Sequence, residues 1–124
     1  MSQNRLIINT EAVFKRLNGN KFLFKELYRI YNMQIEVYMQ EIEDSLAKWD
    51  FQKIAAHCHS LESCFKVVGA ELCEDANIKL SQGLKTNKIN QLFGVLTREL
   101  NKYISKYNEI DAPLLQIIKS LNSN

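Results

Sequence analysis

Residues that interrupt helices are scarce in this chain. Its 124 residues include one proline, Pro113, and four glycines. Proline and glycine are the strongest local signals for turns and helix ends, so their scarcity favours long uninterrupted helices joined by few turns. No segment alternates between apolar and polar residues over more than a few positions, and the sequence therefore predicts no β-sheet.

Several functional classes are disfavoured by what is missing. The three cysteines, Cys58, Cys64 and Cys73, are odd in number and fall within helical patterns, so we expect reduced, buried thiols rather than disulfides. The chain has no run of about 20 apolar residues, and its first ten residues lack the apolar centre and the cleavage site of a signal peptide. We therefore expect a cytoplasmic protein that does not enter a membrane. A net charge of +2 from scattered lysines does not indicate nucleic-acid binding.

The chain has the size and composition of one soluble domain, residues 1–124, with 46% hydrophobic and 24% charged residues. Apolar residues recur every three or four positions, which is typical of amphipathic helices. Thr10, Asn20 and Asp50 stand at expected N-cap positions, and Gly69 stands at an expected helix end. The predicted helices cover residues 11–17, 21–48, 51–69, 70–84, 89–108 and 112–121.

The predicted fold class is all-α, with an antiparallel up-down four-helix bundle, because four long amphipathic helices are joined by short connections. The short helix 11–17 must lie against the bundle, since an isolated helix of this length is not stable. Asp111 and Pro113 predict the start of an extra C-terminal helix within residues 111–122. The apolar residues of that segment would dock on the bundle or on a partner.

The second predicted helix, residues 21–48, carries apolar residues on more than one face. Leu23 and Ile30 belong to the stripe that is expected to face the core, whereas Phe24 and Met39 fall on the outer side. This much outward apolar surface predicts either a second core contact or a docking patch.

The helix predicted at 51–69 is the most informative stretch. On a projection of 100° per residue, His59 points about 140° away from the middle of its apolar stripe, whereas His57 lies about 60° from it. We therefore expect His59 to face solvent and His57 to be buried or half-buried. Ser63 and Lys66 share the outer side with His59. The apolar stripe itself consists of Phe51, Ile54, Ala55, Cys58, Leu61, Phe65 and Val68.

The residues around His59 resemble the signature of histidine-containing phosphotransfer (HPt) domains, commonly written A-H-x-L-K-G-x(4)-L-G-A. Glu62 and Ser63 replace the lysine and the first glycine of that signature. The resemblance extends over about residues 10–108 of the chain. The positions that match at the expected spacing are His59, Leu61, Gly69 and Ala70.

The resemblance implies a phosphorelay protein rather than an enzyme. His59 would accept a phosphoryl group from the aspartyl phosphate of one receiver domain and pass it to another receiver. Receiver domains of response regulators are therefore the expected partners, together with a hybrid histidine kinase. No cofactor of its own is implied, because the Mg²⁺ ion would be held by the receiver. We expect a monomer.

Other residues are expected to assist His59. Ser63 is small and leaves room for the receiver. Glu62 places a like charge near the phosphoryl group, which costs roughly 1 to 3 kcal/mol at about 6 Å. Lys66, or more weakly Lys85, would offset that charge. The resemblance also implies that a receiver docks on the short first helix and the start of the second, through Val13, Phe14, Leu17 and Phe22.

Two other interpretations stay open, and a third is disfavoured. In the first, the protein is a degenerate HPt-like module that binds receivers or a kinase without being phosphorylated, as a scaffold or brake, and Glu62 motivates this reading. In the second, the chain is an unrelated helical bundle with an accidental motif, and His59 would then be packed inside. A zinc site formed by the neighbouring histidines and cysteines is disfavoured, because their spacing matches no Cys-x-x-Cys pair.

Overall fold

The computed structural model describes the backbone of residues 4–122 and the side chains of residues 4–110. The described residues form helices and no strand, which confirms the predicted all-α class. Over this part of the chain, no helix offers an apolar stretch long enough to cross a bilayer. The helices of residues 4–122 are α1 (Thr10–Arg16), α2 (Lys21–Ala47), α3 (Phe51–Val68), α4 (Glu71–Gln82) and α5 (Ile89–Asn122).

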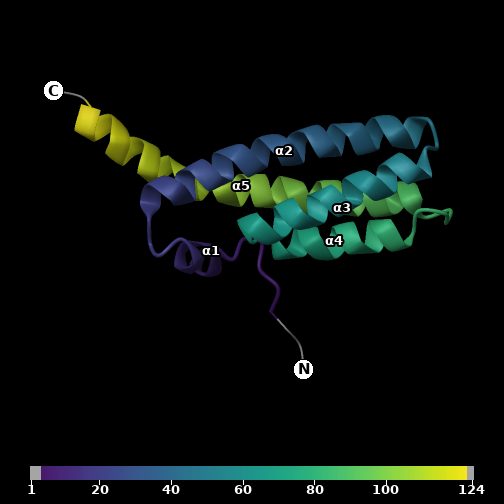
Figure 1. The fold of residues 1–124 in the computed structure, drawn as a ribbon, viewed down its shortest axis with the longest axis horizontal. Coiled ribbons are helices and arrows are strands. Elements are labelled where there is room, and N and C mark those ends of the chain that lie inside the picture. Colours follow the sequence, from purple (N-terminus) through teal and green to yellow (C-terminus); the bar gives the residue numbers. More distant parts are fainter. Residues whose placement is uncertain (1–3, 123–124) are drawn as a thin grey trace.

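The long helices α2 to α5 lie alongside one another, and successive helices run in alternating directions (Figure 1). α3 packs between α2 and α4, and α4 packs against α5. α5 and α2 meet through long side chains, because Tyr103 donates a hydrogen bond to Asn32 and the stacked rings of Tyr28 and Tyr107 have centroids 5.3 Å apart. One core therefore extends between all the long helices.

The apolar side of α3 lies at the centre of this core. The five side chains on this side, named at the end of this paragraph, are each at most 2% exposed. Burying a large apolar side chain contributes about 1.5 to 3 kcal/mol to the free energy of unfolding. Ala55, which the sequence placed in the same stripe, is exposed because it lies about 100° from the middle of the stripe on the helix projection. The residues that we call the inner face of α3 are Ile54, Cys58, Leu61, Phe65 and Val68.

Both ends of α3 form as predicted. The side chain of Asp50 accepts a hydrogen bond of 3.2 Å from the backbone N–H of Lys53, and Gly69 ends the helix in the left-handed conformation with a φ of 73°. A Cβ atom at position 69 would approach the carbonyl oxygen of Asn9 to 2.9 Å. Glycine is therefore required by the backbone angle and by the close passage of the chain before α1.

α1 is anchored on the C-terminal end of α3. Arg16 donates hydrogen bonds of 3.3 and 2.8 Å to two carbonyl oxygens in the last turn of α3. The backbone N–H of Asn9 donates a hydrogen bond of 2.8 Å to the carbonyl of Gly69. The N-cap of α1 is Asn9, not the predicted Thr10, because this anchoring holds the Asn9 side chain over the first turn.

The side of α2 that faces the core overlaps only partly with the predicted one. Phe24 and Met39, expected on the outer side, are each 8% exposed, whereas Leu23 and Ile30, expected inside, are 47% and 42% exposed. α2 packs against α3 and also meets α5, so its core side is the one that lies between these two neighbours. Periodicity alone could not choose between two apolar faces of one helix.

α5 runs without a break from Ile89 to Asn122, so the structure has one helix where the sequence predicted two. Pro113 removes one backbone donor from the helix, but the loss of a single hydrogen bond does not divide α5 at this point. The predicted docking of the apolar residues within 111–122 lies outside the described side chains.

Candidate functional site

The outer face of α3, which we define as His59, Glu62, Ser63 and Lys66, carries the candidate phosphoacceptor. His59 is exposed to solvent, as predicted. Within the described part of the chain, no hydrogen bond or ion pair holds its imidazole. Both ring nitrogens are therefore open to a partner, which is the first requirement for a histidine that acts as a nucleophile.

Three of the four side chains one turn away from His59 are small, and the fourth is Glu62. Ala55 and Ser63 lie four residues before and after it, Ala56 lies three residues before it, and all three are exposed. Residues at these spacings are neighbours on the surface of a helix. On the side of these three residues, the atoms of a partner can therefore approach a ring nitrogen of His59 without displacing a bulky side chain.

A buried asparagine on α4 holds the backbone directly before His59. The side-chain nitrogen of Asn77 donates a hydrogen bond of 2.8 Å to the carbonyl oxygen of Cys58, at a buried position. This contact fixes α3 against α4 at the level of the candidate site. Asn77 was not predicted, although a polar residue within the apolar repeat of Cys73 and Leu80 was a usable signal, because buried polar groups need partners.

Glu62, the main departure from the HPt signature, has a cationic neighbour. Its Oε1 atom lies 3.3 Å from Nζ of Lys66, one turn further along the outer face. An exposed pair of this kind contributes no more than about 0.5 kcal/mol. The ammonium group of Lys66 can therefore leave Glu62 for a more highly charged anion at small cost.

The predicted cations occupy different parts of the molecule. Lys66 shares the outer face of α3 with His59, whereas Lys85 is exposed in the segment between α4 and α5. Arg16, which the sequence did not suggest for the site, reaches the last turn of α3 from α1. Of these three side chains, only that of Lys66 is on α3 itself, seven residues and about two helical turns after His59.

His57 is half-buried between α2 and α3, as predicted. Its side chain is 21% exposed, and its Nε2 atom lies 3.1 Å from Oε2 of Glu41. Its ring also lies against Tyr38, with centroids 6.0 Å apart. These contacts occupy the imidazole of His57, which therefore joins two helices instead of facing an incoming partner.

Only part of the predicted docking surface is accessible. Val13 is completely buried, which is a correction: its side chain packs beside Gly69 and holds α1 on the core, so it cannot contact a partner. Phe14 and Leu17 are half-buried. Phe22 is 72% exposed and is the most accessible of the four predicted docking residues.

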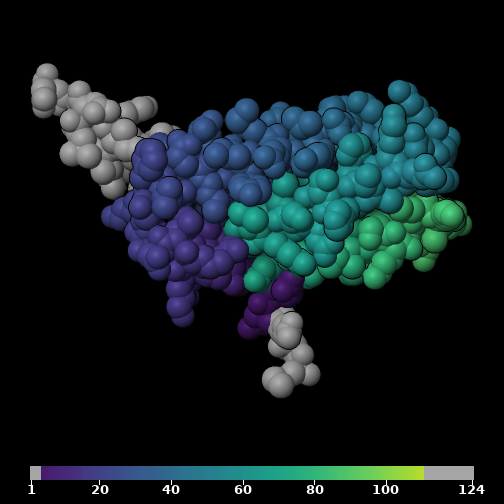
Figure 2. All heavy atoms as spheres, viewed as in Figure 1, coloured from purple at the N-terminus to yellow at the C-terminus, as the bar shows by residue number. Residues whose placement is uncertain are grey.

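More exposed apolar side chains follow Phe22 along α2. All of them are large, and each is at least 42% exposed. Figure 2 shows that α1, α2 and α3, coloured from purple to teal, form one continuous face of the molecule. An apolar surface of this kind is a candidate interaction site. The residues that we call the α2 stripe are Phe22, Leu23, Ile30, Met33 and Val37.

The cysteines do not contribute to the site. All three are free and buried, as predicted. Burial raises the pKa of Cys58 to about 11, and burial together with the charge of Glu99 raises the pKa of Cys73 to about 12. These thiols are therefore protonated and poor ligands at neutral pH. Among the described residues, no group of three or more histidine, cysteine or acidic side chains is arranged to hold a metal ion.

Comparison of the chain with models of protein families, with curated proteins and with solved structures found no match. The chemistry of the site is therefore argued from its own residues and contacts. Those contacts leave one histidine, His59, open to a partner and engage the other, His57, between two helices.

Proposed function

We propose that the protein is a phosphorelay intermediate of the HPt kind. His59 accepts a phosphoryl group from the aspartyl phosphate of one receiver domain and passes it to another receiver. The observation that carries this proposal is the exposed imidazole of His59, which has no partner among the described residues. It stands on a helix whose backbone is hydrogen-bonded to Asn77 of α4. The proposed scaffold is an antiparallel up-down four-helix bundle of α2 to α5, and the alternating helix directions support it (Figure 1).

In the proposed reaction, the lone pair of an unprotonated ring nitrogen of His59 attacks the phosphorus atom of the aspartyl phosphate. The new N–P bond forms as the P–O bond to the aspartate breaks, and the aspartate leaves as a carboxylate. The reverse sequence delivers the phosphoryl group to the second receiver. The Mg²⁺ ion of the receiver supplies most of the charge neutralisation, so this chain mainly supplies the position of the nucleophile.

Charges on the outer face of α3 adjust this transfer. The carboxylate of Glu62 disfavours a phosphoryl group one turn away, whereas the ammonium group of Lys66 favours it. Since the two side chains form a weak exposed pair, Lys66 turns toward the phosphoryl group when the histidine is modified. Ser63 contributes by being small.

The receiver docks beside His59 on the face formed by α1, α2 and α3. Phe22 and the half-buried residues Phe14 and Leu17 provide apolar contacts there, and the α2 stripe extends the surface. We propose that the carrier acts as a cytoplasmic monomer, in which this face is free for receivers and for a hybrid histidine kinase.

The proposal is tested by incubating the protein with a radiolabelled phosphorylated receiver and Mg²⁺. We expect the label to move to the wild-type chain in a form that is acid-labile and alkali-stable. The His59→Gln variant should take up no label, because glutamine offers no nucleophilic nitrogen of comparable strength. The matched control is His57→Gln, two residues away on the same helix, which should still be labelled.

Circular dichroism and thermal unfolding establish that both variants are folded. Labelling of His59→Gln at the wild-type rate would contradict the proposal. The absence of any label on the wild-type chain with several cognate receivers would contradict it as well.

A second candidate function is a docking module that binds receivers or a kinase without being phosphorylated. The position of Glu62, paired with Lys66 beside the imidazole, favours this reading, because it places a negative charge where the phosphoryl group would sit. Unchanged receiver binding by His59→Gln, together with no label on the wild-type chain, would select this candidate.

A further inference from the structure

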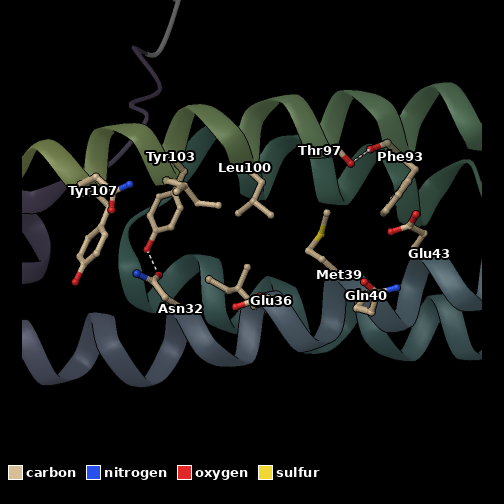
Figure 3. A pocket seen from close by; sticks show the side chains of 13 residues that line it. Asn32, Glu36, Met39, Gln40, Glu43, Phe93, Thr97, Leu100, Tyr103 and Tyr107 are labelled. Atoms are coloured by element: carbon tan, nitrogen blue, oxygen red, sulfur yellow. Dashed lines mark hydrogen bonds between the residues drawn. The ribbon is translucent and has the colours of Figure 1, made fainter.

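A groove runs between α2 and α5, away from the helix that carries His59. It encloses about 590 Å³, and among the described residues its lining comes from these two helices alone, with no residue of α3. Figure 3 shows the side chains that line it, with Tyr103 hydrogen-bonded to Asn32 across the groove and Tyr107 beyond that pair. The phosphotransfer proposed for His59 makes no use of this site.

The groove has an apolar floor. Met39 on α2 and Leu100 on α5 point toward each other across it (Figure 3), and each is 8% exposed. Phe93 and Ile104 extend the apolar surface along α5, and Ile104 is 44% exposed. A volume of this size and an apolar lining are typical of binding sites rather than of packing defects.

The rim of the groove is negatively charged. Glu36 and Glu43 are the only charged side chains among the described residues that line it. Both are exposed, and neither forms an ion pair within the described part of the chain. An occupant that covers the apolar floor and carries positive charge at its edge would therefore complement the groove.

The shape of the groove indicates which occupant fits. Its lining extends over residues 32–43 of α2 and 93–108 of α5, which correspond to lengths of about 16 and 22 Å at 1.5 Å per residue. A helix of about 11 to 15 residues has this length. Glu36 and Glu43 are seven residues apart, so they lie on one side of α2, about 10 Å from each other.

We propose that the groove between α2 and α5 binds a basic amphipathic helix of a partner protein. Apolar side chains of that helix fill the floor at Met39 and Leu100, and two lysines or arginines spaced seven residues apart meet Glu36 and Glu43. This is the helix-in-groove mode of recognition, with charge setting the orientation. Because α3 does not line the groove, a bound helix leaves His59 accessible to a receiver.

The test uses two synthetic helical peptides of about 14 residues that share one leucine face. One peptide carries lysines seven residues apart beside that face, and the other carries glutamates at the same positions. We expect the lysine peptide to bind about tenfold more tightly, as two exposed ion pairs predict, when affinity is measured by fluorescence anisotropy. Amide shifts in NMR spectra should locate the bound peptide on α2 and α5.

Variants assign the effect to the groove. Glu36→Lys combined with Glu43→Lys should reverse the preference, so that the glutamate peptide binds more tightly. The matched control is Glu11→Lys combined with Glu109→Lys, which changes the net charge equally at exposed positions outside the groove and should keep the preference. Ile104→Arg, at an exposed apolar position of the lining, should weaken the lysine peptide about tenfold.

Three results would overturn the proposal. One is equal affinity for the two peptides, and another is a preference that the Glu36 and Glu43 variants leave unchanged. The third is binding of a small alkylamine such as dodecylamine in the groove without binding of the lysine peptide, which would make the groove a small-molecule site. Labelling of His59 is measured separately, so failure of this proposal is distinguishable from failure of the proposed phosphotransfer.

Discussion

His57 and His59 are two residues apart on α3 and have opposite surroundings. His57 is half-buried, paired with Glu41 and in contact with Tyr38. His59 is exposed and has no hydrogen-bond or ion-pair partner within the described residues. Two residues turn a helix by about 200°, so one imidazole is directed toward α2 and the other toward solvent.

The comparison teaches that the residue type does not decide which histidine is the candidate nucleophile. Both imidazoles have the same intrinsic chemistry, but a partner can reach only the one that the helix presents outward. The same division separates the inner face of α3, which holds the core together, from the outer face, which is available for chemistry. A substitution on one face of α3 should therefore leave the property that depends on the other face unchanged.

The largest expected effect concerns stability. Phe65→Ala on the inner face should lower the free energy of unfolding by about 3 to 5 kcal/mol, because it removes a completely buried ring. Ser63→Ala, two residues away on the outer face, should change it by no more than about 0.5 kcal/mol. Urea unfolding followed by circular dichroism measures both. Equal losses in the two variants would refute the division of α3 into two faces.

A smaller effect should appear when the pH is raised. Burial raises the pKa of Cys58 on the inner face from 9.0 to about 11, so the unfolded chain releases this thiol proton at a lower pH than the folded chain. The free energy of unfolding is therefore undiminished below about pH 9 and falls between about pH 9 and pH 11, by on the order of 1 kcal/mol per pH unit for this thiol.

Urea unfolding at a series of pH values measures this loss. Burial also raises the pKa of Cys73, to about 12, and the pKa values of the buried tyrosines, so these groups act in the same direction. Cys58→Ala should therefore reduce the slope of the free energy of unfolding against pH without removing it. A slope that Cys58→Ala leaves unchanged would show that this thiol ionises as easily in the folded chain as in the unfolded one.

The smallest effect concerns the rate of transfer at the outer face. Glu62→Lys should speed phosphoryl transfer from a receiver about tenfold, because it replaces a repulsive charge near the phosphoryl group with an attractive one. Glu62→Gln removes the repulsion without adding an attractive charge, so its transfer rate should fall between those of the wild type and Glu62→Lys. The rate of label uptake under single-turnover conditions measures both changes. Slower transfer by Glu62→Lys would mean that Glu62 contacts a basic residue of the receiver.

Much of the helix structure around the candidate site was predictable from the sequence. The exposure of His59 and the half-burial of His57 followed from the helical period. The Asp50 cap and the Gly69 end followed from residue types that only a few backbone positions favour. These features depend on neighbours within about one helical turn, so sequence patterns determine them.

Other features could not be predicted because they depend on distant contacts. α2 has two apolar sides, and only its packing against α3 and α5 decides that Phe24 is buried and Leu23 exposed. Val13 is buried because α1 folds back onto Gly69. The hydrogen bond from Asn77 to the carbonyl of Cys58 joins residues 19 apart in the chain, and no local pattern specifies such a pair.

The sequence by itself determined that the chain is helical, where most of its helices begin and end, and which histidine of α3 points outward, because local hydrogen bonding and the helical period govern these properties. The tertiary structure decided which side of α2 is buried, how α1 is anchored, and that a groove with an acidic rim lies between α2 and α5. These depend on how helices far apart in the chain pack together, and packing selects among faces that the sequence leaves equally apolar.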